Sequence, residues 1–472
     1  QELIQIGKIL LDSKINHLKA INDKINKNYY HKAKLINTNI IINDAFILAS
    51  MNGHVKVLEW FKNINLKFKY SINAIDFAYR GTDAIVTPAF NRPIGESDCV
   101  NCGQCRVVCP TGAISIKTNI DLVWDAIADK DTKVVAQIAP AVRVAVGDQF
   151  GLPKGSNVMG KIVAMLHKIG VDEVYDTTYG ADLTVIEESK EFLNRIAENK
   201  KLPLFTSCCP GWVKYCENRH PDLVENVSTC RSPQQMFGAV LREHFKNPEN
   251  SGGKKIVSIS IMPCTAKKEE IQRKESITNG KQDVDYVITT TELVTMIKRS
   301  GIHFDELDLE SCDMPFGIGS GAGVIFGVTG GVTEAVLRRL ANGNSRADME
   351  FIKTSGVRGL EGTKELSINY NGRTIQAAVV SGLGNAEKLL QKIESGEAHY
   401  DFVEVMACPG GCIMGGGQPV EADSNKEVRA KGLYDIDVNT QIKKSTENPL
   451  ITQLYDGILK GKEHHLLHRN ME

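Results

Sequence analysis

Most of the chain alternates short, apolar, β-branched runs with longer amphipathic stretches. The short runs have the length and composition of buried strands, and they occupy residues 134–142, 171–177, 202–209, 255–264, 284–289 and 401–412. Apolar residues recur at helical spacing in residues 158–170, 184–200 and 290–301. Strands that alternate with helices in this way predict an α/β fold whose sheets are mostly parallel.

The two ends of the chain have a different pattern. Residues 1–72 are rich in Ile, Asn and Lys, and apolar residues at helical spacing, interrupted at Gly53, predict two helices joined by a tight turn. The stretch around Ala49, Gly53 and His54 resembles a divergent ankyrin repeat; a generic helical hairpin is the alternative. Residues 426–472 predict a polar, helical C-terminal extension.

Composition and charge narrow the classes of partner. Of the 472 residues, 42% are hydrophobic and 24% are charged, as in globular proteins with large cores. The 56 Lys and Arg residues nearly balance the 57 Asp and Glu residues, which leaves a net charge of -1 and disfavours nucleic-acid binding. No apolar run reaches the roughly 18 residues of a transmembrane helix, and the opening segment is too charged for a signal peptide. We expect no nucleic acid and no membrane among the partners, and a cytoplasmic location.

Four of the twelve cysteines form one motif. Cys99, Cys102, Cys105 and Cys109 precede Pro110 in the spacing Cx2Cx2Cx3CP of bacterial ferredoxins, which hold 4Fe-4S cubes. A zinc site would more often show paired CxxC elements. In two-cluster ferredoxins the fourth cysteine binds the other cluster, which requires a second such motif. Because no cysteine precedes Cys99, we expect an incomplete or rebuilt electron path with one accessory 4Fe-4S cluster at most.

Three further cysteine motifs follow predicted strands. They are TSCCPGW at 206–212, MPCTAKKEE at 262–270 and EVMACPGGCIMGGG at 404–417. Because open α/β sheets place ligands beyond the carboxyl ends of their strands, we expect these motifs to meet at one site. Four thiolates, one from CC, one from MPC and two from CxxxC, suit a second iron-sulfur cluster. The isolated cysteines are expected to be small hydrophobic residues of the interior: Cys216, Cys230 and Cys312.

The three motifs, in this order, resemble the signatures of the iron-only (FeFe) hydrogenases, most of all the clostridial monomeric type. The resemblance runs from about residue 73 to the C-terminus, and it implies an α/β, two-lobed catalytic domain with mostly parallel sheets. The implied parts are a helical ankyrin-like segment, a partial ferredoxin-like segment, the H-cluster catalytic domain and its helical extension, at residues 1–72, 73–118, 119–425 and 426–472. The implied reaction is the reversible reduction of protons to H2.

The resemblance implies an H-cluster as the cofactor. This is a 4Fe-4S cube joined through one cysteine to a two-iron subsite with CO, cyanide and an azadithiolate bridge. By motif position, Cys209, Cys264, Cys408 and Cys412 hold the cube, and Cys412 is the bridging thiolate. Lys267 matches the family lysine that hydrogen-bonds a cyanide. The other pocket positions of the family match Ala139, Pro140, Ser232, Gln234, Met262, Phe326 and Met406.

The same resemblance implies a proton route. Cys208 matches the thiol that donates protons to the bridgehead amine, a role that a tunable thiol pKa suits. Glu188, Glu191 and Arg195 share one face of a predicted helix, a spacing that by itself favours a solvated charged face. In the family these positions form a relay in the order Cys208, Glu191, Ser228, Glu188, with Arg195 at the surface end.

Partners follow from the resemblance as well. It implies ferredoxin or flavodoxin as the electron partner, maturation enzymes for the two-iron subsite, and an anaerobic or low-oxygen compartment.

One alternative function is that of an iron-sulfur assembly protein without H2 chemistry, although such relatives lose the residue types found here at Cys208, Glu191 and Lys267. A second is an interaction protein whose N-terminal segment binds a partner and whose enzyme half is impaired. Three C-terminal histidines are expected on an exposed helix end: His464, His465 and His468.

Overall fold

The computed structural model describes residues 74–78, 85–88, 93–109, 111–340, 352–420 and 425–469. The predicted ankyrin-like segment lies outside these residues. The chain divides into two compact units, Gln1–Cys99 and Val100–Glu472. In the described part of the first unit, strands β1 (Asp76–Ala78) and β2 (Ile85–Thr87) pair antiparallel.

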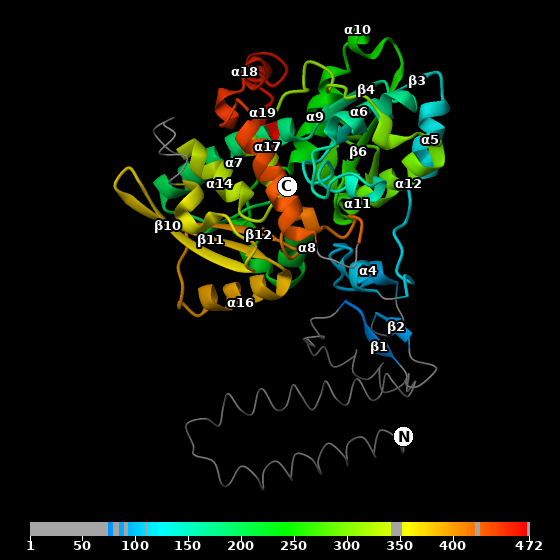
Figure 1. Ribbon diagram of the computed structural model, residues 1–472. Helices are drawn as coiled ribbons and strands as arrows, with labels where there is room; N and C mark the ends of the chain where they lie inside the picture. The colour runs from blue at the N-terminus through cyan, green and yellow to red at the C-terminus, as the bar shows by residue number, and fades with distance from the viewer. Residues whose placement is uncertain are drawn as a thin grey trace, which may run out of the picture. The chain divides into compact units, whose positions relative to one another are not determined.

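The second unit has two four-stranded sheets, each in its own lobe (Figure 1). The first sheet is parallel throughout, and its order is β4 (Glu173–Asp176), β3 (Thr132–Ile138), β6 (Lys255–Met262) and β9 (Tyr286–Thr289). Its central strands are β-branched and almost continuously buried, as expected for a sheet with helices on both faces.

Helices cover both faces of this first sheet. One core contains side chains of β3 and β6 together with those of α5 (Ile120–Ala128), α6 (Met159–Lys168) and α12 (Thr290–Ser300). The opposite face packs against α7 (Thr178–Glu198) and α9 (Pro233–His244). Thr289 and Glu292 form a capping box at the start of α12, which fixes where the strand β9 turns into the helix.

The second sheet has the order β10 (Thr363–Tyr370), β11 (Arg373–Ser381), β12 (Phe402–Met406) and β5 (Leu204–Phe205). β11, β12 and β5 are parallel, whereas β10 pairs antiparallel with β11. This hairpin turns through Asn371 and Gly372, whose φ angles of 49° and 80° are those of a tight two-residue turn. The hairpin is absent from the predicted elements.

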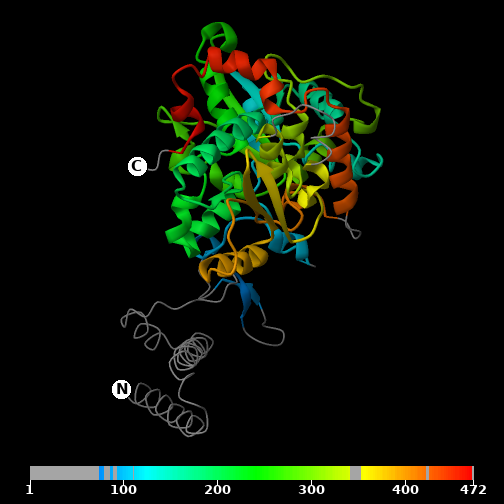
Figure 2. The same cartoon turned by 90° about the vertical axis from the view of Figure 1, so that its left-hand side faces the viewer.

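Helices also enclose the second sheet. α8 (Pro210–Arg219) and α16 (Leu383–Glu394) pack on one face, and α14 (Gly331–Leu340) and the end of α7 pack on the other. The short elements of the second unit are α4 (Gln104–Val108), α10 (Pro248–Ser251), α11 (Ala266–Glu270), β7 (Ile277–Thr278), β8 (Lys281–Gln282) and α13 (Gly321–Val324). The C-terminal helices are α17 (Lys426–Asn439), α18 (Pro449–Asp456) and α19 (Glu463–Leu467), which lie on the outside of the unit (Figure 2).

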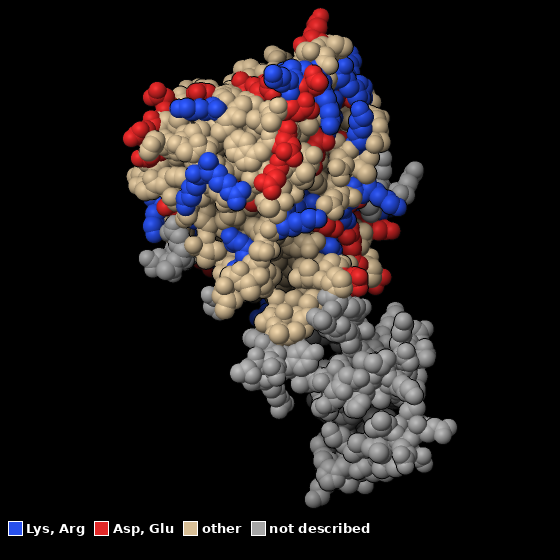
Figure 3. Space-filling model, turned by 90° about the vertical axis from the view of Figure 1, so that its right-hand side faces the viewer, with Lys and Arg blue, Asp and Glu red and all other residues tan. Residues whose placement is uncertain are grey.

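The expected α/β fold with two lobes and mostly parallel sheets is confirmed, since every predicted strand run contains a strand of one of the two sheets. Lys and Arg side chains are interspersed with Asp and Glu on the face in Figure 3, as the balanced composition suggests. In the part of the chain that the structure describes, no helix combines the length and apolar character needed to span a membrane.

Candidate active site

Cysteines from three loops meet where strands of the two sheets end. Cys209 follows β5 and caps the N-terminus of α8, Cys264 follows β6, and Cys408 and Cys412 follow β12. The backbone N–H of Ala407 donates to Sγ of Cys209 over 3.3 Å. The charges of Cys209 and Cys264 both act on the thiol of Cys412 and on that of Cys408. The structure therefore brings the four predicted cube ligands together.

Burial makes this group of thiols costly to ionise unless a cation is present. Burial, opposed by Lys267 and reinforced by Cys209, raises the pKa of Cys264 to about 12. Burial and the charges of neighbouring cysteines also raise the pKa of Cys408 and of Cys412. Because thiolates are the metal-binding form, four thiolates crowded in one buried place fit a multiply charged iron-sulfur core that neutralises them. The donor set thus fits the cube of an H-cluster.

The CxxxC segment turns tightly between its two cysteines. Gly410 and Gly411 have φ angles of 86° and 87°, a left-handed conformation that glycine adopts without strain. The N–H of Gly411 donates to the carbonyl of Cys408 over 3.0 Å, and a Cβ at Gly411 would lie only 2.6 Å from the backbone nitrogen of Thr329. The turn therefore requires glycine, and it keeps Cys408 and Cys412 on one side of the loop.

Lys267 lies beside the cysteines in a hydrogen-bonded group. Its ammonium donates to the carbonyl of Cys208 over 3.2 Å and to the two carboxylate oxygens of Glu270 over 3.1 and 3.0 Å. Ser232 and Gln234 each donate to Oε2 of Glu270 over 2.9 Å. Burial lowers the pKa of Lys267, but Glu270 together with the charges of Cys264 and Cys208 outweighs burial and raises it. Glu270 is absent from the predicted site residues, although it is the last residue of the motif MPCTAKKEE and this position was the available signal.

Apolar side chains enclose the same region. Cys208 packs in one cluster with Phe326 and Met406, and each of the three is at most 7% exposed. Such packing keeps water away from a reactive centre. Buried positions at the ends of β3 and β6 complete the enclosure: Ala139, Pro140 and Met262.

A chain of polar groups leads outward from Cys208. Glu188 is fully buried, accepts one backbone N–H over 3.4 Å, and has no hydrogen-bond partner among the described residues at its other carboxylate oxygen. Ser228 donates its hydroxyl to Oε2 of Glu191 over 2.9 Å and also contacts Glu188. Arg195 pairs with Oε1 of Glu191 at 2.5 Å. All five residues predicted for the proton route lie along this chain.

The predicted order of the two glutamates is wrong. The first half of α7 is buried and its second half reaches the surface, so Glu188 is the deeper residue and Glu191 the outer one. Burial and the charge of Glu188 raise the pKa of Cys208. Burial, with a further contribution from Glu191, raises the pKa of Glu188 to about 8. The observed order is Cys208, Glu188, Ser228, Glu191 and Arg195.

The expected exposed helix end is also wrong for one histidine. His468 is 9% exposed, because its backbone forms a β-bridge with Cys230 that draws it inward. Its Nδ1 lies 2.9 Å from the hydroxyl of Thr229, and its Nε2 lies 3.3 Å from a carboxylate oxygen of Glu187. The other two histidines are exposed as expected.

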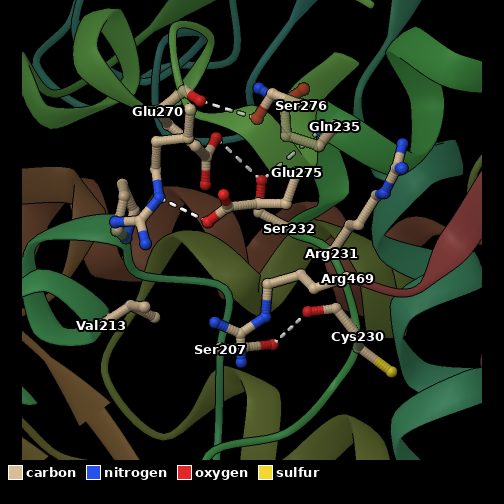
Figure 4. Close-up of a pocket in the computed structure, with 12 residues that line it drawn as sticks. Ser207, Val213, Cys230, Arg231, Ser232, Gln235, Glu270, Glu275, Ser276 and Arg469 are labelled. Atoms are coloured by element: carbon tan, nitrogen blue, oxygen red, sulfur yellow. Dashed lines mark hydrogen bonds and ion pairs between the residues drawn. The ribbon is translucent and has the colours of Figure 1, made fainter. Parts of the chain in front are cut away.

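A small cavity of about 20 Å³, room for about one water molecule, lies between the Lys267 group and the proton route (Figure 4). Ser232, Glu270 and Arg469 contribute to its lining. Ser207 donates its hydroxyl to the carbonyl of Cys230 over 2.7 Å. Figure 4 shows the sulfur of Cys230 pointing away from Ser207 and Glu270. The thiol therefore faces the proton route rather than the cavity.

The ferredoxin-like loop of the second unit packs directly on the cube-binding loops. Gln104 and Arg106 of α4 donate to the carbonyls of Met414 and Gly416 over 2.9 and 3.3 Å. The charge of Cys102 is among those that raise the pKa of Cys408. Thiols of the two motifs are therefore electrostatic neighbours, which places any cluster held by Cys102 next to the main site.

The remaining cysteines of this motif differ in their surroundings. Cys105 lies within α4, and Cys109 follows it. A hydrogen bond with the Thr111 hydroxyl and others with backbone groups lower the pKa of Cys109 to about 7. Cys99 is the last residue of the first unit, whereas the other three belong to the second. The full ligand set of an accessory cluster stays a prediction.

Family models match most of the described chain. Residues 132–416 match the C-terminal domain of the iron-only hydrogenase large subunit, residues 423–470 match the iron hydrogenase small subunit, and residues 93–115 match a 4Fe-4S binding domain. The fold and the cysteine site define an iron-sulfur oxidoreductase of the hydrogenase type. The chain belongs to the iron-only (FeFe) hydrogenase family. Its cofactors are an H-cluster and iron-sulfur of the 4Fe-4S cluster type.

Individual relatives agree with this membership. The chain is 44% identical over 404 residues to an NADP-reducing hydrogenase subunit of Solidesulfovibrio fructosivorans, covering 82% of this chain and 68% of that protein. It is 39% identical over 369 residues to iron hydrogenase 1 of Clostridium pasteurianum, covering 76% of this chain and 64% of that protein. An FeFe-hydrogenase structure from Chlamydomonas reinhardtii superposes with a TM-score of 0.65 at 38% identity, covering 74% of this chain and 98% of that one.

A more distant relative has a different role. The chain is 28% identical over 388 residues to a cytosolic Fe-S cluster assembly factor of Xenopus tropicalis, covering 78% of this chain and 80% of that protein. Membership of the wider family therefore leaves two activities to be distinguished by the site itself.

Proposed function

We propose that the chain is a ferredoxin hydrogenase that catalyses 2H⁺ + 2e⁻ ⇌ H2. The observation that carries this proposal is the meeting of three features at one place. Four cysteines suited to a cube, the buried Lys267 and the thiol of Cys208 lie together. A polar chain then connects Cys208 with the outer residues Glu191 and Arg195.

The cofactor residues take the following roles in this proposal. Cys209, Cys264, Cys408 and Cys412 hold the cube, and Cys412 is shared with the two-iron subsite. When bound, the H-cluster supplies the iron chemistry that combines protons and electrons into H2. Lys267, kept charged by Glu270, donates to a cyanide ligand. The pocket positions that exclude water and hold Glu270 in place are Ala139, Pro140, Ser232, Gln234, Met262, Phe326 and Met406.

Proton delivery is the work of this chain's own side chains. The buried thiol of Cys208 keeps its proton at Sγ until it is passed inward. Glu188, with a pKa of about 8, can both hold and release a proton near neutral pH, which is what a relay needs. The hydroxyl of Ser228 links the two carboxylates, and Glu191 with Arg195 exchanges protons with the outside.

Electron delivery follows the loop at residues 100–109. We propose one accessory 4Fe-4S cluster at most, held by Cys99, Cys102 and Cys105 with a further ligand, or by these three with Cys109. Ferredoxin or flavodoxin is the proposed electron partner, and we expect weaker coupling to it than in relatives with a complete set of clusters. The short contacts of α4 with the cube-binding loops support this entry point.

The wider organisation is proposed from the same resemblance. The parts are an N-terminal segment that offers a surface to a protein partner, a partial ferredoxin-like segment, the catalytic domain and its helical extension, with the boundaries given above. Maturation enzymes build the two-iron subsite in an anaerobic or low-oxygen cytoplasm, where cysteine-held clusters persist.

The second candidate function is cluster assembly without H2 chemistry, as the role of the Xenopus relative suggests. The buried group of Cys208, Glu188 and Lys267 favours the hydrogenase, because a protein that only holds a cube has no use for a proton donor.

The direct test is H2 evolution from reduced methyl viologen, using the full chain produced together with hydrogenase maturation enzymes. We expect turnover in the intact chain. Protein that carries its 4Fe-4S iron after competent maturation yet evolves no H2 would favour the assembly role instead.

A further inference from the structure

We propose that Glu191, Cys230 and His468 form a binding site for a soft divalent transition-metal cation, best matched by Zn²⁺, at the outer end of the proton route. A carboxylate oxygen, the thiol sulfur and an imidazole nitrogen of these residues all lie within 4.8 Å of one another. None of the three is a proposed ligand of an iron cluster. The metal site stands on its own geometry, and only its effect on turnover rests on the proposed function.

The spacing of the three groups suits one small cation. Sγ of Cys230 lies 3.9 Å from Oε2 of Glu191. A tetrahedral zinc ion with bonds of about 2.3 Å to sulfur and about 2.0 Å to nitrogen or oxygen separates its ligands by roughly 3.5 Å. The hydroxyl of Thr229 lies 2.9 Å from Nδ1 of His468 and 3.1 Å from the same Oε2. A cation bound between these three groups therefore replaces the Thr229 hydroxyl between Glu191 and His468, and it competes with the hydroxyl of Ser228 for Oε2.

The imidazole of His468 is oriented by a carboxylate at its second nitrogen, as metal-binding imidazoles commonly are. While Nδ1 of His468 faces Thr229 and the Glu191 carboxylate, Nε2 faces Glu187 at 3.3 Å. Glu187 is fixed in turn by Lys190 at 2.7 Å and by the hydroxyl of Tyr455. A carboxylate that accepts the second ring N–H orients the histidine and strengthens its other nitrogen as a ligand.

Charge also favours a cation here. The carboxylates of Glu191, Glu188 and Glu187 all act on the thiol of Cys230. A divalent ion with one carboxylate, one thiolate and one neutral imidazole makes a neutral group, which a half-buried position tolerates better than a net charge. Binding releases the thiol proton to solvent, as is general for cysteine ligands.

A surface pocket of about 340 Å³ gives access to the site. Glu191, Thr229, His464 and His468 are among the residues that line it. The ring of His464 stacks parallel to that of His468 with centroids 5.0 Å apart, and water from this pocket can occupy the fourth position. Arg195 binds Oε1 of Glu191, so the cation takes the other oxygen, Oε2, in competition with the donors from Ser228 and Thr229 that this oxygen now accepts.

Occupancy would take Glu191 out of the proton route. A metal-bound carboxylate no longer exchanges protons with Ser228 in either direction, so the bound ion slows H2 evolution without touching the iron cofactor. The chain would thereby couple H2 chemistry to the concentration of a free divalent metal.

The test is zinc K-edge X-ray absorption on the iron-loaded full chain with one equivalent of ZnCl2. We expect one sulfur at about 2.3 Å and two or three nitrogen or oxygen ligands at about 2.0 Å. The sulfur signal should disappear in Cys230→Ala and persist in Cys312→Ser, which removes a thiol elsewhere. His468→Gln, a second variant that keeps Cys230, should weaken zinc binding about tenfold or more. Iron content shows that each variant is folded.

Zinc should also inhibit H2 evolution, and the inhibitory concentration should rise about tenfold or more in Cys230→Ala and His468→Gln, each compared with its own zinc-free rate. Oxygen-only coordination, or a sulfur signal retained in Cys230→Ala, overturns the proposal, and so does an unchanged inhibitory concentration in both variants. The zinc K-edge measurement reports the metal's ligands whether or not the protein turns over. A chain with the expected zinc signal but no zinc-free H2 evolution would sink the proposed function and leave the metal site standing.

Discussion

Glu188 and Glu191 lie one helical turn apart on α7, yet their surroundings give them different chemistry. Glu188 is fully buried, with one carboxylate oxygen that has no hydrogen-bond partner among the described residues. Glu191 is bound by Ser228, Thr229 and Arg195. A buried carboxyl without a cation beside it keeps its proton near neutral pH. The inner residue is therefore the one that stores a proton.

Replacing Glu188 with Gln removes this proton store with little change of shape. We expect H2 evolution from reduced methyl viologen to fall about 100-fold or more, the usual scale for loss of a positioned proton-transfer group. Iron content should not change. Glu198→Gln, an exposed position on the same helix, is the matched control, and wild-type rates in Glu188→Gln would contradict the observed order of the relay.

Glu188 should also leave a mark on stability. Its carboxyl loses its proton near pH 4.5 in the unfolded chain but only near pH 8 in the folded protein. Between these values the unfolded chain binds fewer protons, so stability falls as the pH rises, and the loss is complete above about pH 8. We measure the midpoint temperature of thermal unfolding. The midpoint of Glu188→Gln, relative to that of the wild type, should be higher at about pH 8 than at about pH 5. A difference that does not change with pH would place Glu188 in a solvated setting.

At the scale of elements, buried ion pairs join the C-terminal extension to the catalytic lobes. Arg338 on α14 pairs with Glu334 at 2.5 Å and with Asp437 on α17 at 2.7 Å, and all three side chains are at most 2% exposed. Arg358 pairs with the same two carboxylates. Such pairs explain how the polar helix α17 packs at all, since its sequence has no clear apolar face.

Removing Arg338 should therefore weaken this junction. Arg338→Ala leaves two buried carboxylates with Arg358 alone, and we expect a loss of about 3 kcal/mol in unfolding free energy, measured by thermal unfolding under anaerobic conditions. Lys431→Ala, whose partner Asp435 is on the exposed side of α17, should change little. Equal effects of the two substitutions would show that the buried pairs do not support the junction.

The sequence predicted elements best where burial alone decides them. The strands β3, β6 and β12 are buried on both faces and rich in β-branched residues, so their composition indicated them and the cysteines that follow β6 and β12. The hairpin strand β10 alternates exposed and buried residues at a sheet edge and carries several polar side chains, which hid it despite the Asn371-Gly372 turn. Helix α17 spans Lys426–Asn439, at the start of the helical extension predicted for residues 426–472.

At the scale of the molecule, the cofactor could be predicted from the sequence, whereas the order of the residues along the proton route could not. The spacing of the cysteines indicated iron-sulfur sites, and the resemblance to the family then implied the H-cluster and its four ligands. The order of Glu188 and Glu191, the role of Glu270 and the burial of His468 depend on how α7, α11 and the C-terminus pack together. Local spacing on one helix says which residues share a face, but it does not say which end of that face is deep.

Electron delivery makes a prediction at this scale. If one accessory cube is present, the matured protein should contain about eight iron atoms beyond the two-iron subsite, and about four if none is present. About twelve iron atoms beyond the subsite would contradict the limit of one accessory cluster.

Deleting residues 1–72 should leave H2 evolution with an artificial reductant unchanged. A clear loss of activity would instead assign the N-terminal segment a part in the enzyme half.

The most direct measurement is infrared spectroscopy of the full chain after production with hydrogenase maturation enzymes. A hydrogenase with Cys412 as the bridging thiolate and Lys267 at a cyanide should show CO and cyanide stretching bands, together with H2 evolution from reduced methyl viologen. Protein that carries its full 4Fe-4S iron under competent maturation but shows no CO or cyanide bands would contradict this account.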